Sequence, residues 1–226
     1  MNTITNGGVC QMAYREEMQK VQQGLQQSIV HTACHLFMER GIEPVKMTDL
    51  ALSADVGVAS LYRYFGTKRE VVIQAGIHLW HKVAQLLDGV FTSEVYLSKT
   101  GLAQCEDLLK VFLAAYTGHA PYVKFLRDFD LFMEREQVPQ AELAAYEASI
   151  LDLQTPARAA YRKGLADGTL RGDFDFETYY FTVTHALLLL SQKLVCAGAL
   201  VESDARVSGE KQLLAMIDMA VTYIKK

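Results

Sequence analysis

The stretch from residue 47 to residue 70 constrains the fold more than any other part of this sequence. Its first half has apolar residues at the i, i+3, i+4 and i+7 positions, a spacing that buries one face of a short helix. We predict that this helix stops at Asp55, because Asp tolerates the left-handed backbone that a tight turn requires. A second short helix is predicted after Gly57, with Leu61 and Phe65 pointing inward.

The outer face of this second helix begins with small side chains and continues with aromatic and basic ones. In order they are Val58, Ala59, Ser60, Tyr62, Arg63 and Tyr64. Thr67 and Glu70 then match a capping box, so a new helix is predicted to start at Thr67 with Lys68 beside its free N–H groups. Free backbone N–H groups next to a lysine form a phosphate site. This pattern is typical of a helix-turn-helix that places its second helix in the major groove of DNA.

Three segments, 29–41, 47–51 and 61–68, resemble the TetR family of one-component transcriptional regulators in order and spacing. The resemblance covers roughly residues 21–86, and the remainder matches only in length and in being helical. It implies phosphate contacts from Tyr62, Tyr64 and Lys68. It also implies base or near-base contacts from Thr48, Val58, Ala59, Ser60 and Arg63.

Three positions depart from the family pattern. Lys46 and Gly57 stand where the two helices of the motif usually have Ser or Thr caps, and both are included in the predicted DNA-contacting set. Asp55 stands where the turn usually has Gly. The alternative is an ordinary helical hairpin with core aromatics, but it does not explain Arg63 between two tyrosines or Lys68 at a helix start.

The charge of the chain is divided unevenly between its two parts. The net charge is −4, yet residues 1–75 hold seven Lys or Arg and seven Asp or Glu, so the acidity lies beyond them. Because the predicted DNA-binding part is not strongly basic, we expect its non-specific affinity for DNA to be modest. Binding should then require two DNA-binding parts acting together.

The rest of the chain predicts an all-α fold, because no sustained period-two alternation occurs. Helices are predicted over 21–40, 67–88, 102–117, 121–136, 139–154, 156–166, 174–197 and 209–225. We divide the chain into a flexible N-terminal arm (1–20), a three-helix DNA-binding domain (21–66) and a C-terminal helical domain (67–226). The last domain is expected to bind a ligand, to dimerise and to begin with a connecting helix from residue 67.

The last two predicted helices indicate a homodimer. Residues 179–195 are apolar nearly all the way round, so packing one face inside the protomer leaves another uncovered. A membrane span is excluded because the unbroken apolar run 186–190 is far shorter than the roughly 20 residues required. The resemblance likewise implies a two-fold four-helix contact. The predicted interface residues are Tyr180, Thr184, Leu187, Leu188, Ser191, Leu214, Ile217 and Val221.

An aromatic-rich stretch precedes these helices, and it suggests an apolar site with a few polar groups for a small apolar or amphipathic effector. The candidate ligand-binding residues are Phe112, Tyr116, His119, Phe125, Asp128, Phe129, Tyr146 and His185.

Catalytic and cofactor-binding signatures are missing from the sequence, which has no Gly-rich phosphate loop, G-x-S-x-G or H-E-x-x-H. We therefore predict no enzyme activity, no cofactor and no metal. The spacing of His31 with His35, and of His78 with His81, makes metal binding geometrically possible, but a solvated helix face is the favoured interpretation. Four scattered cysteines and the lack of a secretory signal predict a reduced, cytoplasmic location.

Together these features predict a homodimeric, ligand-responsive, sequence-specific DNA-binding regulator. A repressor released from a palindromic DNA operator by a small molecule is the expected form. The alternative is a protein of the same fold that acts as a coactivator through a protein partner, without binding DNA.

Overall fold

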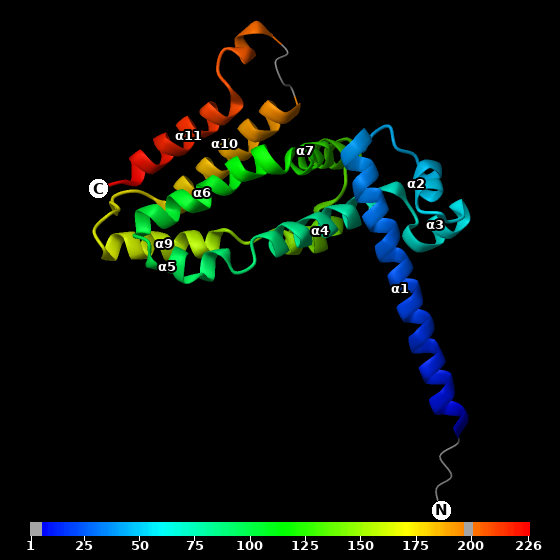
Figure 1. Ribbon diagram of the computed structural model, residues 1–226. Coiled ribbons are helices and arrows are strands. Elements are labelled where there is room, and N and C mark those ends of the chain that lie inside the picture. The colour runs from blue at the N-terminus through cyan, green and yellow to red at the C-terminus, as the bar shows by residue number, and fades with distance from the viewer. Residues whose placement is uncertain (1–5, 197–200) are drawn as a thin grey trace, which may run out of the picture. The chain divides into compact units, whose positions relative to one another are not determined.

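The computed structural model describes residues 6–196 and 201–226, with side chains described from residue 15 onward except at residue 16. Over these ranges the fold is all-α, as predicted, and the one β-bridge joins Leu170 to Lys225 (Figure 1). The α-helices are α1 (Asn6–Arg40), α2 (Met47–Ser53), α3 (Val58–Phe65), α4 (Lys68–Leu86), α5 (Glu94–Ser98), α6 (Gly101–Gly118), α7 (Ala120–Arg135), α8 (Ala144–Ser149), α9 (Gln154–Ala166), α10 (Phe176–Cys196) and α11 (Gly209–Ile224). Short 3-10 helices are η1 (Val90–Thr92), η2 (Gln140–Leu143) and η3 (Glu202–Ala205).

The chain forms two compact units, Met1–His78 and Leu79–Lys226. In the first unit, α1, α2, α3 and the start of α4 enclose a core that includes Phe37, Leu50 and Leu61, each at most 1% exposed. Gly41 has a left-handed φ of 83° and ends α1, because a residue without a Cβ adopts that conformation at little cost.

Helix α1 begins much earlier than the sequence predicted. It starts at Asn6, whereas the prediction placed a flexible arm over 1–20 and a helix start at residue 21. The prediction relied on apolar periodicity, and the described side chains of 17–24 are all exposed, so no such periodicity marks this part. Its residues are nevertheless rich in Gln, Glu, Met and Lys, which favour helices intrinsically. The arm's residues 1–5 lie outside the described residues.

The second unit is built around α6, which packs against α9, α10 and α11 (Figure 1). One buried cluster joins α6 and α9 through Cys105, Leu108 and Ala160, and a second joins α6, α10 and α11 through Leu109, Leu187 and Leu213. These two clusters form the hydrophobic core of the second unit.

Two local predictions in this unit were wrong. The helix predicted over 139–154 is interrupted: η2 and α8 are followed by Ile150 in an extended conformation, and Asp152 then accepts a hydrogen bond from the Thr155 N–H before α9. Helix α5 was missed, although Ser93 caps it by accepting from the Tyr96 N–H at 3.2 Å. Both cases depend on short-range side-chain to backbone hydrogen bonds, which hydrophobic periodicity does not detect.

None of the helices in the described ranges combines the length and the hydropathy needed to cross a membrane.

Candidate nucleic-acid interface and ligand cavity

The turn between α2 and α3 has the geometry predicted from the sequence. Asp55 has a φ of 53°, and the Val56 N–H donates to the Ala51 carbonyl at 2.9 Å, which closes the turn. Gly57 is the N-cap of α3, with extended φ and ψ of −68° and 140°. At the start of α2, where a hydroxyl cap is missing, the Lys46 N–H instead donates to the Asp49 carboxylate at 2.8 Å.

Helix α3 buries its inner face and presents the predicted contact residues outward. Leu61 and Phe65 are buried, whereas Val58, Ala59, Tyr62 and Arg63 are exposed. Of the remaining predicted DNA-contacting residues, Ser60, Tyr64 and Lys68 are half-buried, and Lys46, Thr48 and Gly57 are exposed. The sequence-predicted set therefore lies on the accessible part of α2, α3 and the start of α4.

Arg63 and Lys68 both contact neighbours within this unit. The Arg63 guanidinium carbon lies 5.1 Å from the centre of the Tyr64 ring, and its Nη2 donates to the Tyr64 hydroxyl at 3.3 Å. The Lys68 Nζ donates to the Glu43 carbonyl at 3.0 Å. At the start of α4, the Glu70 N–H donates to the Thr67 hydroxyl at 3.2 Å, which is half of the predicted capping box. The Arg63 guanidinium keeps further N–H donors that a DNA strand can use.

A sequence model of the TetR family of bacterial regulatory proteins matches residues 29–75, which contain this turn and most of the first unit. Residues 29–75 therefore resemble the helix-turn-helix region of TetR-family regulators, and within them α3 corresponds to the recognition helix of a helix-turn-helix.

Similar proteins extend the likeness beyond the matched residues. The HTH-type transcriptional repressor KstR2 of Mycolicibacterium smegmatis is 23% identical over 156 residues, which are 67% of this chain and 70% of the repressor. The FadR regulator of Bacillus subtilis, solved with stearoyl-CoA, superimposes with a TM-score of 0.62 at 12% identity, over 88% of this chain and 98% of FadR. The superantigen PfiT superimposes with a TM-score of 0.59 at 18% identity, over 89% and 96%. At these identities the two structures show a shared fold.

The second unit contains a cavity of about 770 Å³. Its walls come from α4, α5, α6, α7, α8 and α10 together with the segments that join them, and its lining is mainly apolar. Four of the eight predicted ligand-binding residues line it: Phe112, His119, Tyr146 and His185. Burial raises the pKa of Tyr146 to about 12, so this hydroxyl is a neutral hydrogen-bonding group at physiological pH.

The other four predicted ligand-binding residues do not line this cavity. Phe125 and Phe129 are buried in the core of the unit, and Phe129 stacks on Tyr146 at 4.2 Å between ring centres. Tyr116 packs against Gly209 at the start of α11. Asp128 is half-buried, and desolvation raises its pKa despite the opposing effect of Lys124 and Arg127. Aromatic content alone does not distinguish a core residue from a cavity wall.

Sequence reasoning missed several polar residues of the cavity, among them Lys99, Asp107 and Lys110. The ammonium of Lys99 lies 2.5 Å from the Asp107 carboxylate, and that of Lys110 lies 2.7 Å from Glu106. Since both lysines are paired with carboxylates, the cavity offers little uncompensated positive charge. Of these ion pairs, the sequence indicates the one between Lys110 and Glu106, because residues four apart on a helix lie on the same face.

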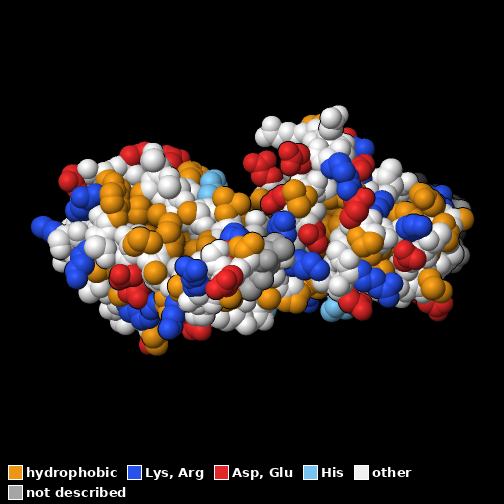
Figure 2. All heavy atoms as spheres, turned by 90° about the horizontal axis from the view of Figure 1, so that it is seen from above, with side chains coloured by type: hydrophobic (Ala, Val, Ile, Leu, Met, Phe, Trp, Pro, Cys, Tyr) orange, Lys and Arg blue, Asp and Glu red, His pale blue; other side chains and the backbone are white. Residues whose placement is uncertain are grey.

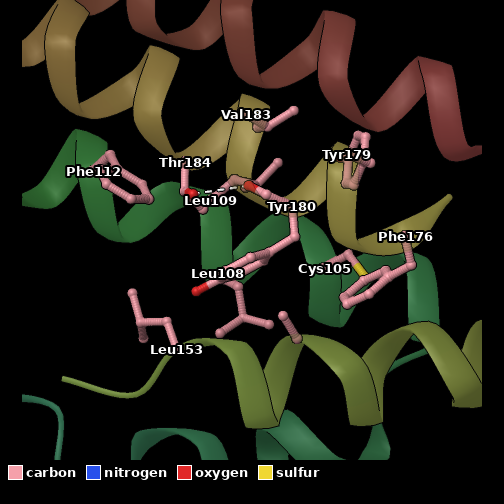
Figure 3. A pocket seen from close by; sticks show the side chains of 11 residues that line it. Cys105, Leu108, Leu109, Phe112, Leu153, Phe176, Tyr179, Tyr180, Val183 and Thr184 are labelled. Carbon is pink, nitrogen blue, oxygen red and sulfur yellow. Dashed lines mark hydrogen bonds between the residues drawn. The ribbon is translucent and has the colours of Figure 1, made fainter.

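A second, much smaller cavity of about 30 Å³ lies among α6, α9 and α10 (Figure 3). Its walls include Cys105, Leu108 and Phe176, and Phe112, Leu153, Tyr180 and Thr184 line both cavities. The Thr184 hydroxyl donates to the Tyr180 carbonyl at 2.8 Å, which leaves the wall between α6 and α10 apolar. A space of this size admits about one methylene or water-sized group.

The predicted dimer residues divide between the core and the surface of the protomer. Leu187, Ser191 and Ile217 are at most 3% exposed inside their own protomer, so they pack in its core. Leu214 is 41% exposed, and Tyr180, Thr184, Leu188 and Val221 are half-buried. On α10 and α11, the exposed large apolar residues that the prediction did not include are Phe181, Leu189, Met219 and Tyr223. Figure 2 shows hydrophobic side chains gathered over the part of the second unit that contains α10 and α11.

Proposed function

We propose that this TetR-family regulator is a homodimeric repressor that leaves a palindromic DNA operator when a small apolar or amphipathic molecule binds. The observation that carries the proposal is the 770 Å³ apolar cavity in a chain whose first unit is a TetR-family DNA-binding domain. Cavities of this size and lining are typical of small-molecule sites.

DNA recognition is assigned to α3 and to the ends of α2 and α4. Exposed Tyr62 and the Lys68 ammonium hold backbone phosphates, and Arg63 reads a base edge in the major groove. Since residues 1–75 carry equal numbers of acidic and basic residues, one reading head has little electrostatic affinity. In a dimer, two DNA-binding units contact the DNA together and supply the missing affinity. They require two half-sites related by symmetry.

The effector is assigned to the large cavity. An apolar body fills the volume between α4, α6 and α10, and hydroxyl or imidazole groups such as Tyr146, His119 and His185 orient it. The pairing of Lys99 with Asp107 and of Lys110 with Glu106 disfavours a ligand that depends on one exposed charge. FadR was solved with stearoyl-CoA, an amphipathic molecule, and this supports the chemical class without identifying the ligand of the present protein.

Helix α4 is the proposed link between the two sites. It starts at Lys68, next to the recognition helix, and its later residues Leu79, Trp80 and Val83 line the cavity. A ligand that favours one position of this helix shifts the population between a DNA-binding and a non-binding state. Moving the population from 99:1 to 1:99 requires a difference in ligand affinity of about 10⁴-fold.

A coactivator that works through a protein partner is the second candidate. The near-neutral charge of the DNA-binding unit favours it, and the likeness to a superantigen shows that this fold alone does not decide function. The repressor proposal is preferred because the predicted contact residues of α3 are exposed on a family-matched helix-turn-helix.

The experiment uses a variant that fills the cavity. Ala115 lines the cavity on α6, and Ala115→Phe should abolish both the rise in melting temperature and the release of DNA caused by an effector found in a compound screen. DNA affinity without effector should stay unchanged. Ala148→Phe is the matched control, because Ala148 is exposed on α8 and does not line the cavity. An effector that acts equally on Ala115→Phe and the wild type would place its site elsewhere.

A further inference from the structure

Three imidazole rings lie together on the first unit. His31 and His35 are one turn apart on α1, both exposed, with ring centres 4.6 Å apart. The half-buried His78 on α4 adds a third ring, whose centre is 5.6 Å from that of His31. Neither the DNA contacts nor the ligand cavity uses these rings.

The two histidines of α1 have the geometry of a chelate. Their Nε2 atoms face each other at 3.3 Å. Two nitrogens that each bind zinc at about 2.0–2.1 Å with a tetrahedral angle are about 3.3 Å apart, so a metal ion would need little movement of either ring. Residues four apart on a helix share one face, and their positions are therefore fixed before any ion binds.

We propose that His31 and His35 chelate a divalent transition-metal ion of the zinc, nickel or copper class on the surface of the DNA-binding unit. Neutral imidazole is a preferred ligand of these ions. This site does not depend on the proposed repressor function. Without metal, the Nε2–H of one ring donates to the Nε2 of the other. When the ion binds both Nε2 atoms, the donor ring carries its proton on Nδ1 instead, so both imidazoles stay neutral.

The surroundings of the pair set the strength of the site. Over the described residues, no group of three or more His, Cys, Asp or Glu side chains is arranged to hold a metal ion, so water completes the coordination. Cys34 lies between the two histidines in sequence, but its side chain is buried in the core, on the other side of α1 from the exposed His31 and His35. The site is therefore an exchangeable surface chelate of moderate affinity.

Metal binding should stabilise the first unit. The chelate exists only when residues 31–35 are helical, so the ion binds the folded chain in preference to the unfolded chain and raises the melting temperature.

The test is calorimetric titration of the full-length, tag-free, chelator-treated protein with Zn²⁺ alone at pH 7.5. We expect micromolar binding, and His31→Gln and His35→Gln should each weaken it by about tenfold or more. Both side chains are exposed, and circular dichroism should show unchanged helix content in the variants. His185→Gln is the matched control, because His185 is an exposed histidine on α10 of the second unit, and it should leave the affinity unchanged.

Two results would overturn the proposal. One is binding no tighter than the millimolar range in the wild type. The other is micromolar binding that persists unchanged in both His31→Gln and His35→Gln, since another set of ligands would then hold the ion.

Discussion

At the scale of single residues, we propose that Arg63 and Lys68 make two different kinds of DNA contact. Arg63 lies on the exposed face of α3 and rests over the Tyr64 ring, which orients its guanidinium without using all of its donors. Lys68 lies at the start of α4, where its ammonium also donates a hydrogen bond to the Glu43 carbonyl. One side chain is suited to reading bases and the other to holding phosphate.

Replacing Arg63 by Ala should therefore reduce specificity. We expect a loss of about 1–3 kcal/mol per half-site on the preferred operator, because a bidentate hydrogen bond to a guanine edge is removed. Binding to random DNA should change much less. Fluorescence anisotropy with operator and random duplexes measures both, and an equal loss on the two would show that Arg63 contacts phosphate.

Replacing Lys68 by Ala should weaken binding to every sequence alike. The slope of log affinity against log salt should fall by roughly one for each DNA phosphate that a subunit no longer neutralises. Since Lys68 also bonds the Glu43 carbonyl, the melting temperature of the variant should be measured in parallel. A variant that keeps its stability and its salt slope would exclude Lys68 from the phosphate site.

The buried cysteines should be unreactive in the folded protein. Burial raises the pKa of the Cys34 thiol to about 11 and that of Cys105 to about 12, so very little thiolate exists at pH 8. Iodoacetamide should modify neither residue at pH 8 in buffer, and it should modify both in denaturant. Peptide mass spectrometry provides the measurement, and rapid labelling of Cys34 in buffer would contradict its burial.

At the scale of helices, the sequence predicted those elements whose signals are local and failed where packing decides. The turn at Asp55, the start of α3 after Gly57 and the end of α1 at Arg40, before Gly41, depend on backbone preferences of single residues, and all three are confirmed. Leu187 and Ile217 were predicted to face a second chain and are buried inside their own protomer, because a helix that is apolar nearly all round gives no periodic signal to separate inside from outside.

The cavity could be predicted only in part for a related reason. His119 and His185 were named because an apolar site needs a few polar groups, and both line the cavity. Lys99 and Asp107 were missed because α5 itself was missed. Lys99 directly follows α5, whereas Asp107 lies eight residues later on α6. Which aromatic residues enclose space and which fill it depends on helix packing, as Phe129 demonstrates.

The close packing of α6 on α9 offers a test at this scale. A Cβ on Gly101 would overlap the backbone of Gly164, so Gly101→Ala should lower the free energy of unfolding by about 1–3 kcal/mol or more. Gly118 ends the same helix with open space around its Cβ position, and Gly118→Ala should be neutral or stabilising by up to about 1 kcal/mol. Urea unfolding compares the two. Equal effects would contradict the close approach of α6 and α9.

At the scale of the whole molecule, the proposal requires two chains. Phe181, Leu189, Leu214 and Met219 leave apolar surface exposed on α10 and α11, and contiguous apolar surface of this kind indicates an interface. A dimer also provides a second DNA-binding unit, which the near-neutral first unit needs in order to bind DNA tightly.

Leu189→Arg should separate the subunits. Leu189 is 64% exposed on α10, and a charge there would be buried without a partner in the dimer, at a cost of several kcal/mol. Leu97→Arg is the matched control, because Leu97 is 54% exposed on α5. Sedimentation at micromolar concentration should find a folded monomer for Leu189→Arg and a dimer for Leu97→Arg. A dimer in both would move the interface away from the exposed face of α10.

Selection of bound DNA from a random pool with the purified protein tests the central claim most directly. A homodimeric reader should enrich a two-fold symmetric sequence whose half-sites are centred about 10 base pairs, or a multiple of that spacing, apart. Arg63→Ala should relax the consensus at specific positions while Lys68→Ala preserves it. If the protein enriches no sequence over the starting pool, it is not a sequence-specific DNA reader, and the coactivator becomes the better account of the fold.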